Sequence, residues 1–337
     1  MRISLLWLSV FVSFVSSPAV AQDVAEEPQD RELTILVISD LNDSYGSTTY
    51  SDEVHDVVAR IHAIAPDIIL CGGDMVAGQK ASLTPDQLRA MWAGFQASVL
   101  DPIHELGIPF GFTLGNHDAS PNFKNDRAAA SAFWRANKDK VNLTFVDDTH
   151  FPYYFSYLKH NVFFISWDAS SAVIPPEVKS WMERQLALPV AKGARGRIVL
   201  GHLPLYAIVE SKNKRGEVLD DADETRHFLT AHGVDMYISG HQHAYYPASK
   251  ERLTLFNSGC LGGGPRQLLG HPGPARKSYA MLEIPDKSGI HAAVITGLEA
   301  VDHGPIPLDS LPESVEGFNG FIRRIDLAEP PNPSPVN

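Results

Sequence analysis

The sequence predicts an α/β fold, with two packed β-sheets flanked by α-helices in a single domain. In the first half, continuous apolar runs typical of strands buried on both faces alternate with amphipathic helical patterns. In the second half, a hairpin pattern and several closely spaced strand patterns predominate. The chain has 337 residues, of which 44% are hydrophobic, so it can bury a full core. We find no internal repeat and no linker that would divide it.

The N-terminal residues resemble an export signal. Arg2 precedes an apolar run from residue 3 to residue 15, and Ala19-Val20-Ala21 supplies a small-x-small cleavage site. The run is shorter than the ~18 residues that a membrane-spanning helix needs. We therefore expect a signal peptide at 1–21 cleaved after Ala21, a secreted or periplasmic protein, and no transmembrane segment in the mature chain.

The remaining boundaries follow from composition. Residues 22–32 are acidic and polar and are expected to form a flexible arm. Residues 33–328 form the predicted folded domain, and the Pro-rich residues 329–337 form a predicted disordered tail.

Strands and helices are expected to alternate up to about residue 137. Ser51 can cap the first helix, whose apolar residues recur at helical spacing, and Pro85 stands at the first helical position of the second. The expected strands are 33–39, 67–71 and 109–114, and the expected helices are 51–64, 84–99 and 127–137.

The later segments are richer in strands. Lys159-His160-Asn161 separates two apolar segments and predicts an antiparallel hairpin. Pro175-Pro176 opens a helix to about residue 188, and a short helix surrounds Phe228. The expected strands are 153–157, 162–167, 197–200, 234–239, 253–257, 279–284 and 291–295.

Charge and cysteine content narrow the function. The net charge is -12, which disfavours dedicated nucleic-acid binding because an acidic protein does not profit from counterion release. Cys71 and Cys260 are the two cysteines. They either form a disulfide or remain as two buried free thiols.

Polar residues that can bind metals follow five predicted strands, and several are preceded by a glycine that lets the chain turn sharply. The carboxyl ends of strands are where ligands gather in open α/β sheets, so these side chains can converge. Carboxylate and imidazole groups suit Mn, Fe and Zn, and the absence of thiolate argues against a structural zinc site. Two such cations ~3.5–4 Å apart can clamp a phosphate. The residues are Asp40 with Asn42, Asp74, Asn116 with His117 and Asp118, His202, and His241 with His243.

Four of these motifs, in order and spacing, resemble the calcineurin-like metallophosphoesterase superfamily. They are Gly73-Asp74, Gly115-Asn116-His117-Asp118, Gly201-His202 and Gly240-His241-Gln242-His243. The resemblance spans roughly residues 33–279 and implies a β-sandwich flanked by helices, with the metal site at one edge.

The resemblance also implies a role for each matching residue. Asp40 and His243 would bind a first metal, and Asp74 would bridge two. Asn116, His202 and His241 would hold the second. His117 would be the catalytic histidine, oriented by Asp118, and a metal-bound hydroxide would be the nucleophile.

One position departs from the family pattern. The family usually has Asp-x-His at the first motif, whereas this chain has Asp40-Leu41-Asn42. Either Asn42 still coordinates through its weaker amide oxygen, or the first metal relies on Asp43, Tyr45 or water. Purple-acid-type members use a tyrosine three residues after the bridging aspartate, but Ala77 stands there.

Several further residues are candidates for substrate contact. Tyr45 can reach a metal or the substrate, and Arg266 follows a glycine-rich stretch that either approaches phosphate or is a flexible loop. Lys212, Lys214 and Arg215 fit a solvated loop better than a substrate clamp. Tyr245 and Tyr246 either line the pocket or pack, and His150 either faces the site or is a surface residue.

Together these patterns predict a hydrolase for phosphate mono- or diesters of small molecules, with two divalent metals as cofactors. A metallophosphoesterase-fold scaffold without activity is the alternative, and Asn42 is the feature that favours it. The acidic charge disfavours a nuclease.

Overall fold

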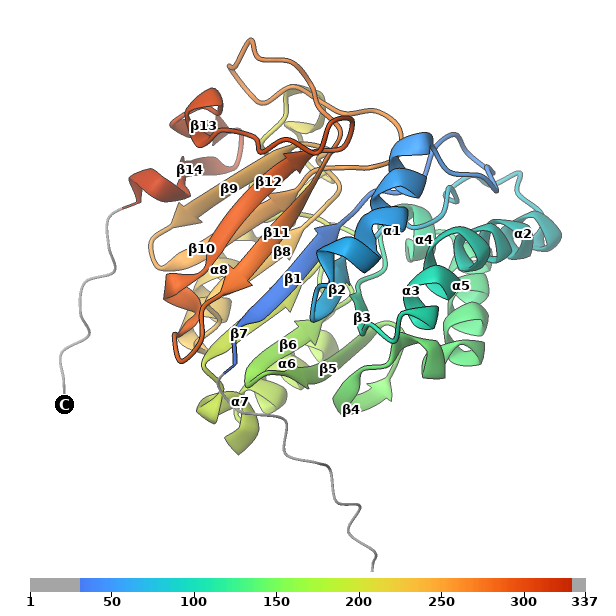
Figure 1. Ribbon diagram of the computed structural model, residues 1–337, viewed down its shortest axis with the longest axis horizontal. Coiled ribbons are helices and arrows are strands. Elements are labelled where there is room, and N and C mark those ends of the chain that lie inside the picture. The colour runs from blue at the N-terminus through green and yellow to red at the C-terminus, as the bar shows by residue number, and fades with distance from the viewer. Residues whose placement is uncertain (1–30, 329–337) are drawn as a thin grey trace, which may run out of the picture.

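The computed structural model describes residues 31–328 (Figure 1). The predicted signal peptide, nearly all of the predicted arm and the predicted tail therefore lie outside the described residues. Within residues 31–328, none of the helices has the length and apolar character required to traverse a bilayer.

The first sheet has five strands in the order β12-β11-β1-β2-β3. β1, β2 and β3 are parallel, and β11 and β12 extend the sheet in antiparallel fashion. The strands are β1 (Leu33–Ile38), β2 (Ile68–Cys71), β3 (Phe110–Phe112), β11 (Ser278–Ile284) and β12 (Val294–Glu299).

The second sheet has nine strands in the order β13-β14-β9-β10-β8-β7-β6-β5-β4. Its centre, β6, β7, β8 and β10, is parallel, and antiparallel strands lie at both sides. The strands are β4 (Thr144–His150), β5 (Tyr154–Lys159), β6 (Val162–Ser166), β7 (Gly196–Leu200), β8 (Met236–Ser239), β9 (Tyr245–Lys250), β10 (Leu253–Ser258), β13 (Ser314–Gly317) and β14 (Gly320–Arg324).

The helices fall into two groups. Figure 1 shows α1 to α5 gathered on one side of the strands and α6 to α8 on another. The first group is α1 (Asp52–Ile64), α2 (Pro85–Phe95), the π-helix η1 (Gln96–Leu100), α3 (Asp101–Glu105), α4 (Asn116–Ala119) and α5 (Lys124–Ala136). The second is α6 (Pro176–Leu186), α7 (Pro189–Gly193) and α8 (Ala222–Ala231).

Two apolar cores follow from this arrangement. The larger core lies between the sheets and under α1 to α5, and the smaller one lies between the second sheet and α6 and α8. At the centre of an aromatic cluster in the larger core, the Trp134 ring stacks on Phe112 at a centroid distance of 3.8 Å. Burial of such apolar surface is the main force that holds the two layers together.

The predicted fold class is confirmed, and the differences lie in element ends. The helix predicted at 84–99 is α-helical only to Phe95 and continues through η1 into α3. The strand predicted at 291–295 begins at Val294, because His291 lies in the 3₁₀-helix Ile290–Ala292. The hydroxyl of Ser51 donates to the carbonyl of Leu261 rather than capping α1.

Four strands were not predicted: β4, β9, β13 and β14. β9 contains Pro247, which argues against a strand inside a sheet because proline lacks an N–H. β14 pairs with β9 only at Ser249 and Ala248, so the missing N–H of Pro247 is not needed on that side.

Cys71 and Cys260 are buried free thiols. Of the two alternatives left open by the sequence, the structure therefore supports free thiols. Burial raises the pKa of both groups, so both remain protonated and unreactive at neutral pH.

Candidate metal centre and active site

The polar strand ends meet at one edge where the two sheets lie together. β1 leads to Asp40 and β2 to Asp74, whereas β7 leads to His202 and β8 to His241 and His243. Backbone hydrogen bonds tie these turns to one another: Asp40 N–H donates to the carbonyl of Gly73 at 2.9 Å, and Gly240 N–H donates to that of His202 at 3.1 Å. Side chains up to about two hundred residues apart in the sequence thus converge, as predicted.

Four of the predicted ligands have a left-handed backbone. The φ angles are 51° at Asp40, 53° at Asp74, 65° at His241 and 53° at His243. This conformation costs a residue with a Cβ of order 1 kcal/mol, and such strain concentrates at functional sites. The turns therefore aim side chains that a relaxed backbone would direct elsewhere.

One group of donor atoms comprises Asp74, Asn116, His202 and His241. Asn116 Oδ1 lies 2.9 Å from His202 Nε2 and 2.8 Å from His241 Nδ1, and those two nitrogens are 3.2 Å apart. Asp74 Oδ2 lies 3.2 Å from His202 Nε2. Bond lengths of 2.0–2.1 Å in a tetrahedral zinc site place its ligand atoms about 3.3 Å from one another. The group is therefore slightly tighter than, and compatible with, a bound divalent cation.

A second group shares Asp74 with the first. The ligand atoms of Asp40, Asp74 and His243 lie within 4.8 Å of one another, and His243 Nε2 is 3.1 Å from Asp40 Oδ1. Asp40 Oδ2 accepts hydrogen bonds from Ser39 Oγ at 2.6 Å and from the His241 N–H at 3.0 Å. Asp74 is therefore the carboxylate that the two groups have in common.

Each histidine ligand gives one ring nitrogen to an outer acceptor and turns the other inward. His202 Nδ1 donates to Gly72 O at 2.7 Å, and His243 Nδ1 lies 3.0 Å from Gly263 O. His241 is reversed, because its Nε2 contacts the Glu217 carboxylate at 2.8 Å and its Nδ1 faces Asn116. These partners select the tautomer that leaves a lone pair for a metal.

The electrostatics of the site favour ionised carboxylates. Burial opposes the charge of Asp74, yet His202, His117 and His241 hold its pKa far below the usual range. For Asp40, burial is likewise outweighed by His243, and the pKa is lowered. Burial and the adjacent Lys212 lower the pKa of His241 to about 3, so its ring is neutral at neutral pH. Burial would lower the pKa of His202, but Asp74 raises it to about 9.

Gln79 is a neighbour of the site that sequence reasoning missed. Its side-chain carbonyl accepts the Asn116 amide N–H at 2.8 Å, which turns Asn116 Oδ1 toward the two histidines. Gln79 has a φ of 65° and its N–H donates to Asp126 at 2.7 Å. Nothing in its sequence context indicates this role.

His117 lies at the rim of the site. Its Nε2 is 4.0 Å from Asp74 Oδ2, and its Nδ1 is 3.2 Å from Gly78 O, so Nδ1 carries the hydrogen. The Tyr45 ring lies over it at a centroid distance of 5.3 Å. His117 therefore presents Nε2 to the space in front of Asp74.

The carboxylate of Asp118 binds backbone N–H groups, and within residues 31–328 the structure shows no hydrogen bond or ion pair between it and the His117 ring. The Asp118 carboxylate accepts the backbone N–H groups of Met75, Val76 and Gly115, at 2.9, 3.0 and 2.8 Å, and Gly78 O orients the His117 ring instead. Burial and the charge of Asp74 raise the pKa of Asp118 to about 7. Asp118 is the third residue of the short helix α4 and caps its own N-terminus, which fixes the loop that carries Asp74.

Asn42 is buried in the turn that follows Asp40. Its N–H donates to Asp74 O at 3.2 Å, and its carbonyl accepts the N–H of Gly263 at 2.9 Å. The side-chain amide makes no hydrogen bond with any residue between 31 and 328. Coordination by Asn42 stays a prediction.

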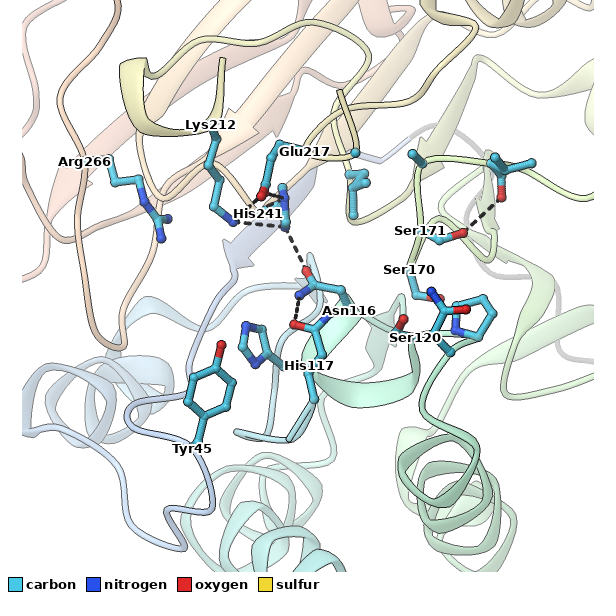
Figure 2. A pocket seen from close by; sticks show the side chains of 17 residues that line it. Tyr45, Asn116, His117, Ser120, Ser170, Ser171, Lys212, Glu217, His241 and Arg266 are labelled. Atoms are coloured by element: carbon cyan, nitrogen blue, oxygen red, sulfur yellow. Dashed lines mark hydrogen bonds and ion pairs between the residues drawn. The ribbon is translucent and has the colours of Figure 1, made fainter. Parts of the chain in front are cut away.

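A polar cavity of about 650 Å³ reaches the first group of donors, of which Asn116 and His241 line it (Figure 2). Asn116, His117 and His241 lie at its base, and Tyr45 lies at one side with 55% of its surface exposed. Figure 2 shows Ser120, Ser170 and Ser171 on the opposite side, and Asn122 also lines the cavity. The cavity can therefore admit a small polar molecule to the donor atoms.

The glycine-rich stretch packs rather than cradling phosphate. The N–H of Gly262 donates to Asp40 O at 2.7 Å, and a Cβ on Gly262 would lie 2.0 Å from Asn42 O. The glycines thus permit close packing against the first strand end. Arg266, beyond them, lines the cavity, and its contact with a substrate stays a prediction.

Lys212 lies at the site, contrary to the solvated loop favoured by the sequence. Its Nζ is 3.2 Å from His241 Nε2 and 3.5 Å from Glu217, whereas Lys214 and Arg215 are exposed. Lys212 and Glu217 come from the loop after His202, which Gln242 holds in place.

The Gln242 side chain is fully buried and makes three hydrogen bonds to that loop. Its carbonyl accepts the N–H groups of Ile208 and Val209 at 3.1 Å, and its amide donates to Glu217 O at 3.0 Å. Gln242, which lies between two predicted metal ligands, His241 and His243, thus brings the loop to the site.

Three other candidates lie elsewhere. His150 is exposed and stacks on Tyr154 at 4.3 Å, so it does not face the site. Tyr245 and Tyr246 are buried, and their hydroxyls donate to Ile295 O and Pro312 O, so they pack.

The family model for calcineurin-like phosphoesterases matches residues 33–245. The protein belongs to this family, whose members typically bind divalent metals. No match is found among curated protein sequences.

Several solved structures are similar to this chain at low identity, and one of them, GAP50, shares its fold. GAP50, described as the anchor in the inner membrane complex of Plasmodium, is 17% identical, with a TM-score of 0.53 over 82% of this chain and 87% of GAP50. The phosphoesterase Yfce of E. coli is 14% identical, with a TM-score of 0.37 over 82% and 97%. Vps29 of Entamoeba histolytica, solved with zinc, is 14% identical, with a TM-score of 0.38 over 81% and 96%.

Proposed function

We propose that this protein is a hydrolase that cleaves phosphate esters of small molecules at a centre of two divalent cations. The observation that carries the proposal is the pair of donor groups that share Asp74, one of which lines the polar cavity through Asn116 and His241. The family membership supports a phosphoesterase in general terms.

Each residue has a place in this reaction. Asp40, Asp74 and His243 would hold one cation, with Asn42 as a further candidate, and Asp74, Asn116, His202 and His241 would hold the other. Bound there, the cations would neutralise phosphate charge and lower the pKa of water.

His117 would supply the proton. Because Nδ1 donates to Gly78 O, Nε2 is the nitrogen that can protonate the leaving oxygen when the phosphorus–oxygen ester bond breaks. Tyr45 covers the ring and limits its movement.

A scaffold without activity is the second candidate, and two observations favour it. Asn42 replaces a histidine of the family pattern, and GAP50, which shares the fold, is described as an anchor. The complete donor group of Asp74, Asn116, His202 and His241 favours the hydrolase, and so does the presence of His117.

The test combines metal analysis with turnover of para-nitrophenyl phosphate. The protein should retain Mn, Fe or Zn, and His117→Ala should lose about 10²–10⁴-fold in kcat with the metal retained. His55→Ala, on the exposed face of α1, is the control and should keep the parental rate. A metal-free protein that is inactive with every added cation would support the scaffold instead.

Export is also part of the proposal. The N-terminal pattern favours cleavage after Ala21. N-terminal sequencing of the mature protein would test it, and a mature chain that begins at Met1 would contradict it.

A further inference from the structure

Two cationic side chains from separate loops reach the same wall of the cavity. Lys212 ends the 3₁₀-helix Glu210–Lys212, and Arg266 lies in the loop between β10 and β11. Figure 2 shows both side chains directed toward the space above His241 and His117. The Lys212 side chain is only 13% exposed, so it is committed to the site rather than to solvent.

Arg266 has a donor that the protein does not use. Its Nη1 is buried and has no hydrogen-bond partner among residues 31–328. Its backbone is fixed, because its N–H donates to His243 O at 3.1 Å. A guanidinium is always charged and all its nitrogens are donors, so this unpaired donor indicates a missing acceptor.

The charges around these two cations indicate an anionic ligand. Lys212 and Arg266 are cationic side chains that line the same cavity, and like charges repel each other. Glu217, 3.5 Å from Lys212 Nζ, is the acidic partner that the loop supplies. Two positive charges therefore face one carboxylate at this wall, which leaves an excess of positive charge for an anionic ligand.

We propose that Lys212 and Arg266 form a clamp for dianionic phosphate, so that the substrates are phosphate monoesters rather than diesters. This inference rests on the proposed function and specifies its substrate class. A monoester carries about two negative charges at neutral pH and three terminal oxygens, whereas a diester carries one charge and two such oxygens. The additional charged oxygen of a monoester is the group that the side chains of Lys212 and Arg266 can bind, in addition to the oxygens bound by the metal cations.

The reaction balances without a further co-reactant. The oxygen of a water molecule bonds to phosphorus, the ester phosphorus–oxygen bond breaks, and the leaving oxygen takes the Nε2 proton of His117 in its imidazolium form. One proton of the attacking water then returns to His117, so the residue ends in its starting state. The products are inorganic phosphate and an alcohol.

The test compares two substrates with the same leaving group, para-nitrophenyl phosphate and bis(para-nitrophenyl) phosphate. For Lys212→Met and Arg266→Met, kcat/KM for the monoester should fall by about 10–100-fold, as expected for a lost charged hydrogen bond. The diester should lose less than about threefold. Lys214→Met, exposed on the same loop, is the matched control.

A second readout does not depend on turnover. Inorganic phosphate should raise the melting temperature of the metal-loaded parent more than dimethyl phosphate does, and Arg266→Met should lose that difference. Lys212→Gln replaces Lys212→Met if the latter does not fold, and metal content is measured for every variant.

The outcomes separate the two proposals. An equal loss for both substrates, no loss for either, or a parent that prefers the diester would overturn the clamp while leaving the hydrolase intact. The opposite case is a parent protein that binds metal and is stabilised more by inorganic phosphate than by dimethyl phosphate, but hydrolyses neither substrate. That result would overturn the hydrolase and support the clamp.

Discussion

Glu217→Gln isolates the contribution of one carboxylate to the metal centre. Glu217 accepts from His241 Nε2 at 2.8 Å and thereby keeps the Nδ1 lone pair free for a cation. A glutamine of the same length can turn its NH₂ group toward Nε2, which favours the opposite tautomer. In that tautomer Nδ1 carries the hydrogen and cannot bind a metal.

The magnitude follows from the charge of Glu217. The hydrogen bond from His241, with Lys212 adding to it, lowers the pKa of the carboxyl from 4.5 to about 2. That change corresponds to roughly 3 kcal/mol in favour of the carboxylate, shared between the two partners and reduced by solvent because the side chain is partly exposed. We therefore expect the affinity for the cation at His241 to fall by about 10–100-fold.

Competitive titration of the metal-free protein with Zn²⁺ against a chromogenic chelator would measure this change. One binding step should weaken, and the step assigned to Asp40 and His243 should change less. Glu210→Gln, exposed on the same loop, is the control. If Glu217→Gln kept both affinities within about twofold, the proposed orienting role of Glu217 would be refuted.

Three further substitutions test the structure around the site. Gly115→Ala should abolish metal binding, because its Cβ would lie 2.1 Å from Asp74 Oδ1 and 2.4 Å from Asp74 N; a variant with normal metal content would contradict this. Gln242→Ala should lower the free energy of unfolding in urea by about 2–4 kcal/mol and open the 207–219 loop to proteases, because two backbone N–H groups lose their acceptor; unchanged proteolysis would argue against it. Trp134→Ala should cost about 3–5 kcal/mol of stability, measured in the same way, while metal content is kept; a loss under about 1 kcal/mol would show that the aromatic cluster can collapse.

The convergence of Asp40, Asp74 and the predicted histidine ligands could be predicted because local sequence patterns show where each buried strand lies and where it ends. A continuous apolar run followed by glycine and a polar residue marks a buried strand and its carboxyl end. Since parallel neighbours end at one edge, convergence follows without knowledge of the loops. The register of the sheets and the four missed strands depend on partners that such local patterns do not reveal.

The surroundings of the ligands could not be predicted in the same way. Glu217 and Lys212 reach the site because Gln242, from another turn, holds their loop, and no local pattern encodes that contact. Asp118 is different, since an acidic residue at the third position of a helix often caps its own N-terminus. That signal was present at Gly115-Asn116-His117-Asp118 and argues against the predicted contact with His117.

The ligands come from both layers of the sandwich, Asp40 and Asp74 from one sheet and His202, His241 and His243 from the other. Any cation that bonds to donors from both layers would crosslink the two sheets. Binding of this cation would slow the separation of the sheets at this edge. The time for which the protein stays folded would then depend on the same donor atoms as its chemistry. Chelators would then loosen the body of the enzyme as well as stop its reaction.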